Sequence, residues 1–327
     1  MKKLLAVLLS LVMMFSVVAL PASAATETAG EISVENIENT IEEAFDVFEA
    51  IFNLVHKIVH TLSEIFDFDC PFCDGSADVE EPEEIVGTIG NAEDLASAVA
   101  AGGTYTAEAD IETDAVEVPA DKKVAIDLND KAISGAAINN KGELAITNGA
   151  VNSETAGIDN SGKATLTDID MKAGSPADYA AIGRAGSYTE FNNVNIESAG
   201  GGIGIDGGKA VFNSGNIAVN SKSTSGRYVF YIVGEGSELV INDGTFSFSK
   251  TLNQKRAYIY AGAGTTVIVN GGTFGPASAR SGYTAGILGD GTIIIKGGTF
   301  GFNPSAWVAE GYEAVKDGSV WTVKAVA

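Results

Sequence analysis

The sequence predicts an all-β fold, a parallel β-solenoid, and three observations support this prediction. A nine-residue motif recurs, reading V-I-V-N-G-G-T-F-G at Val267–Gly275, I-I-I-K-G-G-T-F-G at Ile293–Gly301 and L-V-I-N-D-G-T-F-S at Leu239–Ser247. More divergent copies precede these at spacings of 20 to 29 residues, which is typical of one structural unit per repeat. No copy contains the long amphipathic helix that a βαβ crossover or a leucine-rich repeat requires.

Each repeat predicts two inward-facing positions. The third position is always apolar, occupied by Ile146, Leu166, Phe191, Phe212, Ile241, Val269 and Ile295. The eighth is apolar too, occupied by Val151, Met171, Ile196, Ile217, Phe246, Phe274 and Phe300. Because side chains of a strand alternate between its two faces, these positions should stack into two columns inside the solenoid.

Two further features complete the expected turns. Val124–Leu128 with Ile133 forms a first rung, which makes eight with the seven copies. Between the copies a second short strand is expected around one isoleucine per turn: Ile138, Ile158, Ile182, Ile205, Ile232, Ile259 and Ile287.

The pattern I-x-N-x-G-x-L-x-I-x-N-G at Ile138–Gly149 resembles a known repeat. It is similar to the right-handed parallel β-helix repeat of pectate-lyase-like proteins, and among these to exported bacterial surface and adhesin-like members. The resemblance extends from about Asn91 to the C-terminus. It implies a right-handed parallel β-helix, a fold that carries lyases, hydrolases, adhesins and spike-like proteins.

The chain divides into six expected segments. Residues 1–25 read as a signal peptide, with Lys2 and Lys3 before an apolar run and Ala22-Ser23-Ala24 as the cleavage site. We therefore expect the mature protein to be secreted, or held at the cell surface, with residues 1–24 removed. The other segments are a helix at 26–73, an acidic linker at 74–90, a cap helix at 91–103, the β-helix at 104–302 and a C-terminal cap with a β-hairpin at 303–327.

The long amphipathic N-terminal helix is predicted from a heptad pattern. Apolar residues step by 3 and 4 from Val34 to Ile65, and a second apolar stripe widens this face. Such a face needs a partner, which could be other copies of residues 34–66, the repeat domain or a membrane surface. Self-association is the preferred interpretation, because the acidic opposite face argues against an anionic membrane.

Cys70 and Cys73 are the only cysteines, in the sequence C-P-F-C. A disulfide, within the motif or between neighbouring chains, suits an exported protein. His56 and His60 raise the alternative of a zinc site, but they lie on the outward face of a helix that should continue to about Phe66.

Charge and catalytic residues limit the function. The chain carries a formal net charge of −23, which argues against nucleic-acid binding. Residues 91–327 contain no histidine, and Asp168 and Asp170 are replaced by Asn193 and Asn195 in the next repeat. We therefore predict no catalytic residue, metal or cofactor, although a polysaccharide lyase or hydrolase stays an alternative.

One candidate ligand surface recurs in the later repeats. Three loops each carry an arginine followed within three residues by a tyrosine: Arg227 and Tyr228, Arg256 and Tyr258, and Arg280 and Tyr283. Stacked turns should place these pairs in a column, where guanidinium groups bind carboxylate or sulfate and tyrosine rings contact sugars. The alternative is that the loops share these residues by duplication and the arginines pair with local acids.

The C-terminal cap is expected from Trp307, Tyr312 and Trp321 beside a predicted hairpin turn at Asp317-Gly318. A sugar-binding aromatic platform is the alternative for these rings. Taken together, the sequence favours a surface-interaction or adhesin-like module that binds a glycan or a cell surface. A polysaccharide lyase or hydrolase and a structural component of an extracellular assembly are the other hypotheses.

Overall fold

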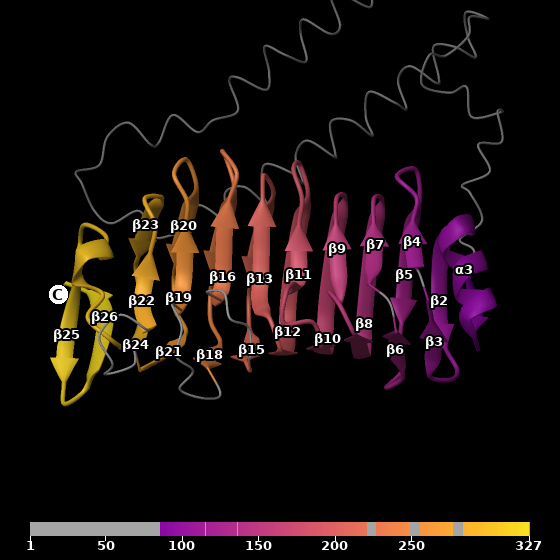
Figure 1. Ribbon diagram of the computed structural model, residues 1–327, viewed down its shortest axis with the longest axis horizontal. Helices are drawn as coiled ribbons and strands as arrows, with labels where there is room; N and C mark the ends of the chain where they lie inside the picture. The colour runs from indigo at the N-terminus through magenta and orange to yellow at the C-terminus, as the bar shows by residue number, and fades with distance from the viewer. Residues whose placement is uncertain are drawn as a thin grey trace, which may run out of the picture. The chain divides into compact units, whose positions relative to one another are not determined.

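A computed structural model describes residues 86–114, 116–135, 137–220, 227–248, 256–276 and 284–326. These residues form a parallel β-solenoid of about nine turns, stacked in chain order (Figure 1). The turn that the sequence analysis did not count is the first one, which contains β2 (Gly103–Ala107), β3 (Ile111–Thr113) and β4 (Val116–Val118). Its strands are short and lack the recurring motif. The predicted N-terminal helix at 26–73, the signal peptide, Cys70 and Cys73 lie outside the described residues.

Each turn contributes strands to three faces. The first face contains β1 (Val86–Ile89), β2, β5 (Lys123–Asp127), β14 (Lys209–Phe212), β17 (Glu238–Ile241), β20 (Thr266–Val269) and β23 (Thr292–Ile295). The second face contains β3, β6 (Ala132–Gly135), β15 (Gly215–Val219), β18 (Thr245–Phe248), β21 (Thr273–Pro276) and β24 (Gly298–Gly301). Three longer strands, β8 (Glu143–Ser153), β10 (Lys163–Ala173) and β12 (Tyr188–Ser198), run through both faces, so these two faces form one sheet.

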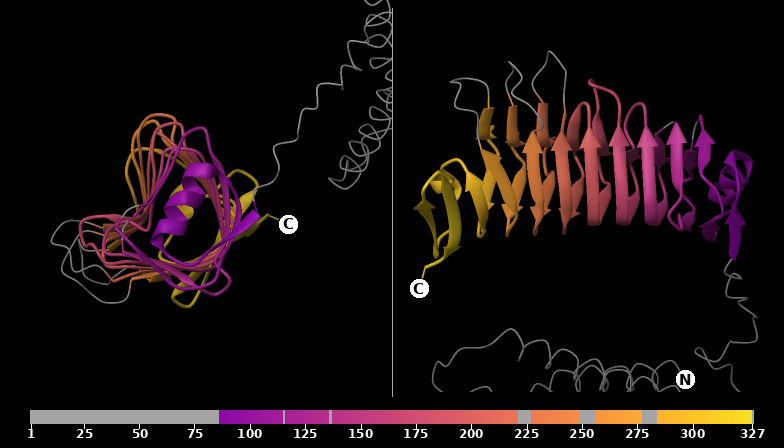
Figure 2. Two further views of the ribbon diagram at one scale, coloured as in Figure 1. Left: turned by 90° about the vertical axis from the view of Figure 1, so that its right-hand side faces the viewer. Right: turned by 90° about the horizontal axis from the view of Figure 1, so that it is seen from below.

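The third face is a separate eight-stranded sheet. It consists of β4, β7 (Ile138–Asn140), β9 (Ile158–Asn160), β11 (Tyr179–Gly183), β13 (Gly201–Asp206), β16 (Arg227–Val233), β19 (Arg256–Ala261) and β22 (Thr284–Leu288). Seen along the stack, the turns superimpose around a common interior (Figure 2). The apolar core fills this interior.

The two predicted inward columns are confirmed. Register pairs run from Ile146 through Phe191 to Ile295 on the first face, and from Val151 through Met171 to Phe300 on the second. These side chains are buried, as expected when one face of every strand lines the core.

The predicted second strand is present around each of the seven isoleucines, but these isoleucines do not share one inward column. Ile158 pairs with Ala181, which pairs with Ile203 and not with Ile205. The column continues through Phe230 to Ile259 and Ile287. Ile182 therefore points outward, because a one-residue shift along a strand moves a side chain to the opposite face of the sheet.

The corner between the first two faces requires left-handed backbone. Asn148, Asp168 and Asn193 take φ values of 53° to 56° in the middle of the three long strands. Asn and Asp tolerate this conformation better than most other side chains. In a later turn, Gly272 of the Val267–Gly275 motif also has a positive φ, of 99°.

Both ends of the solenoid are covered. Helix α3 (Ala92–Ala101) is capped by Asn91, whose side chain accepts from the backbone N–H groups of Glu93 and Asp94, and it lies across the first turns (Figure 2). At the other end, β26 (Val320–Ala325) pairs antiparallel with β24 and with β25 (Tyr312–Asp317), after the short 3-10 helix η2 (Ser305–Trp307). The tryptophans of this cap pack against the core, which blocks further parallel pairing of the last turn.

A buried asparagine pair links neighbouring turns at the ends of β7 and β9 of the third face. The amide nitrogen of Asn140 donates to Oδ1 of Asn160 over 2.7 Å, and Asn160 donates to the Thr189 hydroxyl over 2.8 Å and the Tyr188 carbonyl over 2.9 Å. Asn160 is fully buried, so its side chain supplies hydrogen bonds that water cannot supply to its partners there.

We predict that Asn160→Ala lowers the free energy of unfolding by about 2–4 kcal/mol, because several buried polar groups lose their partners. Urea denaturation measures this. The matched control is Asn270→Ala, which removes a 2.8 Å bond to Asn242 at an exposed position and should cost less than about 1 kcal/mol. Equal losses for the two variants would contradict the assigned role of the buried pair.

Candidate functional site

Four tyrosines gather on the outer surface of the third face. They are Tyr179 on β11, Tyr228 and Tyr231 on β16, and Tyr260 on β19, and all four are half-buried. We call this surface the tyrosine face. It combines rings from turns that are up to 81 residues apart, between Tyr179 and Tyr260 in the sequence.

The rings of the tyrosine face form a continuous set of contacts. Tyr231 lies between Tyr179 and Tyr260, with ring centroids 5.4 Å and 5.1 Å away and planes within 28° of parallel. Tyr228 contacts Tyr231 at 5.4 Å and Tyr260 at 5.0 Å. These separations lie within the range of favourable aromatic pairs.

Two glycines on β13 create the space for Tyr179. A Cβ atom at Gly201 would lie 2.2 Å from the Tyr179 ring, and one at Gly204 would lie 3.0 Å from it. The ring therefore lies over the intervening strand and reaches Tyr231 on the next one. Burial raises the pKa of Tyr179, Tyr228 and Tyr231 above the usual tyrosine range.

One register column of outward positions runs through the tyrosine face and loses its charged residues along the stack. The column changes character along the stack, running through Glu117, Asn139, Asp159, Ile182, Gly204, Tyr231, Tyr260 and Leu288. Its first members are polar or acidic and its last five are not. An apolar outer patch on a strongly acidic chain is typical of a binding surface.

The predicted arginine column is formed only in part. Arg227 and Arg256 pair in register on neighbouring strands. Arg227 donates from Nε and Nη2 to the carbonyl oxygen of Pro176 over 2.9 Å and 2.6 Å. Arg256 is buried, its guanidinium lies 5.4 Å from the centre of the Phe248 ring, and burial lowers its pKa.

The predicted tyrosines take different places. Tyr228 belongs to the tyrosine face, whereas Tyr258 points into the core, where its hydroxyl donates to the Pro276 carbonyl over 3.4 Å. Burial leaves Arg256 and Tyr258 without the exposed position that the sequence analysis expected for them. Arg280 and Tyr283 lie outside the described residues.

Tyr179, Tyr231 and Tyr260 were not predicted as site residues from the sequence. A usable signal was present for two of them. Aligning Arg227 with Arg256 places a tyrosine four residues later in both strands, at Tyr231 and Tyr260, and these two pair in the structure. Tyr179 lies on β11, two strands away from Tyr231. Its ring reaches Tyr231 because the glycines of β13 leave room for it.

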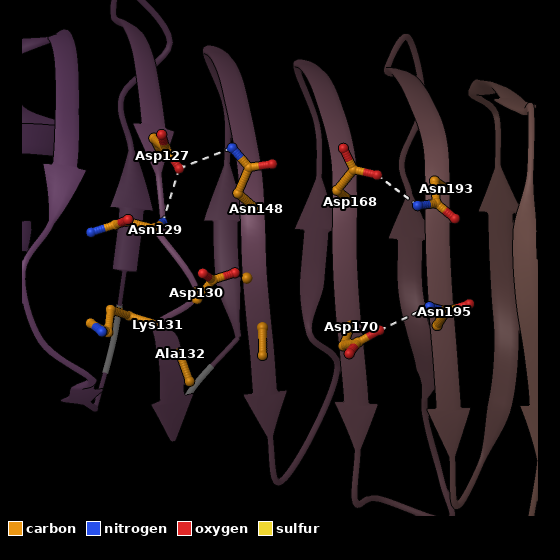
Figure 3. Close-up of a pocket in the computed structure, with 12 residues that line it drawn as sticks. Asp127, Asn129, Asp130, Lys131, Ala132, Asn148, Asp168, Asp170, Asn193 and Asn195 are labelled. Carbon is orange, nitrogen blue, oxygen red and sulfur yellow. Dashed lines mark hydrogen bonds between the residues drawn. The ribbon is translucent and has the colours of Figure 1, made fainter.

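The second candidate site is a hollow at the corner between the first and second faces. It has a volume of about 490 Å³, and four aspartates line it: Asp127, Asp130, Asp168 and Asp170. We call it the acidic groove (Figure 3). Asn193 donates to Asp168 over 2.6 Å, Asn195 to Asp170 over 2.9 Å and Asn148 to Asp127 over 3.2 Å.

The acidic groove corrects the expectation that the aspartates do not converge. In the register, Ala132 and Ala150 precede Asp170 along one column, so small side chains leave the hollow open between acids of separated turns. Even so, no group of three or more acidic, histidine or cysteine side chains in the described ranges is arranged to hold a metal ion. Within the same ranges, no helix is long and apolar enough to span a membrane.

Comparisons of the chain with protein-family models, with curated proteins and with solved structures found no match.

We predict that alkaline pH destabilises the protein partly through Tyr258. Burial raises its pKa to about 12, whereas tyrosine in an unfolded chain ionises near ~10. The unfolded state therefore loses its proton first, and the stability that Tyr258 contributes below pH ~10 is lost as the pH rises towards about 12.

Denaturation midpoints measured across this pH range test the prediction. Tyr258→Phe should reduce the steepness of the decline, while Tyr188→Phe, on the outer side of the first face, should leave it unchanged. An unaltered slope in the Tyr258 variant would show that the decline has another source.

Proposed function

We propose that this protein is a glycan-binding surface module whose ligand lies on the tyrosine face. The observation that carries the proposal is the contact set of Tyr179, Tyr228, Tyr231 and Tyr260 on the outer surface of an acidic chain. Tyrosine provides an apolar ring together with a hydroxyl that can hydrogen-bond to sugar hydroxyls. Rings held by strand pairing also lose little conformational freedom on binding.

The ligand we propose is a neutral polysaccharide. Arg227 is bonded to Pro176 and Arg256 is buried, so the arginines give weaker support to an acidic glycan than the sequence pattern did. A formal charge of −23 repels polyanions. With β-strands about 4.8 Å apart, the three strand spacings from β11 to β19 offer ~14 Å of surface along the solenoid.

The wider biological setting stays a proposal that rests on the sequence. It comprises export by the segment at 1–25, self-association through residues 34–66, a disulfide at Cys70 and Cys73, and membership of the right-handed, pectate-lyase-like β-helix proteins. In that setting the protein acts as an adhesin-like module at or outside the cell surface. A purely structural role in an extracellular assembly is the alternative if no glycan binds.

We predict that Tyr231→Ala combined with Tyr260→Ala weakens binding of a neutral polysaccharide by about fivefold per ring, since each aromatic contact contributes about 1 kcal/mol. A glycan array that holds neutral and acidic glycans identifies the ligand, and calorimetry measures the affinity. Tyr188→Ala is the matched control, because Tyr188 is half-buried on a different face.

Two outcomes would contradict the proposal. Unchanged affinity in the double variant would remove the tyrosine face as the binding surface. If the protein binds only acidic glycans and Arg227→Glu abolishes this binding, the arginines and not the tyrosine rings are the main binding residues.

Hydrolysis of a polysaccharide in the acidic groove is the second candidate, favoured by the convergence of its four aspartates. Glycoside hydrolases use two carboxylates on opposite sides of the scissile bond. Asn193 and Asn195 orient Asp168 and Asp170, and Asp127 and Asp130 lie farther along the groove (Figure 3).

We predict for this candidate that Asp168→Asn with Asp170→Asn abolishes release of reducing ends from a polysaccharide panel. Asp290→Asn, at an exposed site away from the groove, should retain the activity. A wild-type protein that releases no reducing ends, or an active double variant, would eliminate hydrolysis in the groove.

A further inference from the structure

Two tyrosines of neighbouring turns are held in direct register. Tyr231 on β16 pairs with Tyr260 on β19, and their ring centroids lie 5.1 Å apart with planes at 28°. Because parallel strands in register project equivalent side chains in the same direction, corresponding ring atoms lie side by side. Burial raises the pKa of Tyr231, and the neighbouring Tyr260 phenol adds to this effect.

We propose that Tyr231 and Tyr260 are a site of oxidative modification, at which a one-electron oxidant joins the two rings into dityrosine and so links adjacent turns covalently. The proposal stands on ring geometry and does not depend on the glycan-binding function.

The chemistry needs an external oxidant, which we identify as hydrogen peroxide acting through a peroxidase. Each phenol gives up one electron and its hydroxyl proton, which leaves two phenoxyl radicals. The radicals couple through the ring carbons ortho to the oxygens, and the two hydrogens on those carbons shift to the oxygens as the rings regain aromaticity. Overall two tyrosines lose two electrons and two protons, and these reduce one hydrogen peroxide to two waters.

The fold favours coupling within one chain over coupling between chains. The strand pairing holds the two ring centroids 5.1 Å apart, so the second radical does not have to diffuse to the first. Both rings are half-buried, and their exposed part lets the protons leave to water. The described residues contain no cysteine, and Met171 is buried in the core, so exposed sulfur groups of these residues do not compete for the oxidant.

Alternative partners are present in the same surface. Tyr228 contacts Tyr260 at 5.0 Å but with planes at 40°, and it lies diagonally across the strands. The register favours Tyr231, because it aligns the same ring edges. A covalent bond there would close a segment of 30 residues from Tyr231 to Tyr260 and restrain the unfolded chain much as a disulfide does.

The experiment treats the full-length protein with hydrogen peroxide and a peroxidase and isolates the monomer. Mass spectrometry of a digest should find the peptide containing Tyr231 joined to the peptide containing Tyr260 with the loss of two hydrogens. Dityrosine fluorescence should appear in the monomer, and its thermal unfolding midpoint should rise. Tyr260→Phe and Tyr231→Phe each keep the packing and should each abolish this link, whereas Tyr188→Phe should leave it unchanged.

Three results would overturn the proposal. One is a monomer without dityrosine, and another is coupling found only between chains. The third is a link that persists in Tyr231→Phe but disappears in Tyr228→Phe, which would assign the reaction to the diagonal pair.

Discussion

The in-register parallel pairing of successive turns is the constraint on which the rest of this structure depends. Once each strand pairs with its equivalent in the next turn, every position of the repeat becomes a column that runs along the solenoid. A column of apolar side chains fills the interior, as from Ile146 to Ile295. In a column of polar side chains, neighbouring members can hydrogen-bond to one another. Asn242 donates to Asn213 over 2.6 Å, and Asn270 donates to Asn242 over 2.8 Å.

The same constraint organises the charges of the outer surface. Glu143 lies 3.4 Å from both Lys123 and Lys163 of the turns on either side, and Lys209 lies 2.9 Å from Glu238. These exposed pairs add little stability individually, but they avoid like-charge columns, which parallel stacking would otherwise produce. On the separate sheet of the third face, outward positions of β11, β16 and β19 are instead occupied by the rings of the tyrosine face. A run of aromatic residues in outward positions does not serve the core, and this is why we assign it to binding.

Small residues shape both candidate surfaces: in one they make room for a ring, and in the other they leave a hollow open. On β13, Gly201 and Gly204 let Tyr179 lie across the strand and join rings that would otherwise be separated. At the corner of the first two faces, Ala132 and Ala150 leave a hollow that acids of several turns enclose. The first surface offers apolar rings for a ligand to cover, and the second offers carboxylates already bonded to asparagine amides. These differences favour binding over hydrolysis as the main role.

The sequence alone determined the solenoid, its inward columns on two faces, the cap helix and the C-terminal hairpin, because each follows from local periodicity, capping or turn chemistry. It did not determine the first turn, whose strands lack the motif, or the register of the third face, where loops of different length precede each strand. That register decided that Ile182 and Tyr231 point outward while Tyr258 points inward. On the other two faces, the pairing of β5, β8 and β10 places Asp127 and Asp168 along one groove. Only the tertiary structure could settle these points, because a strand reverses the direction of its side chains with every residue, so a shift of one position exchanges surface for core.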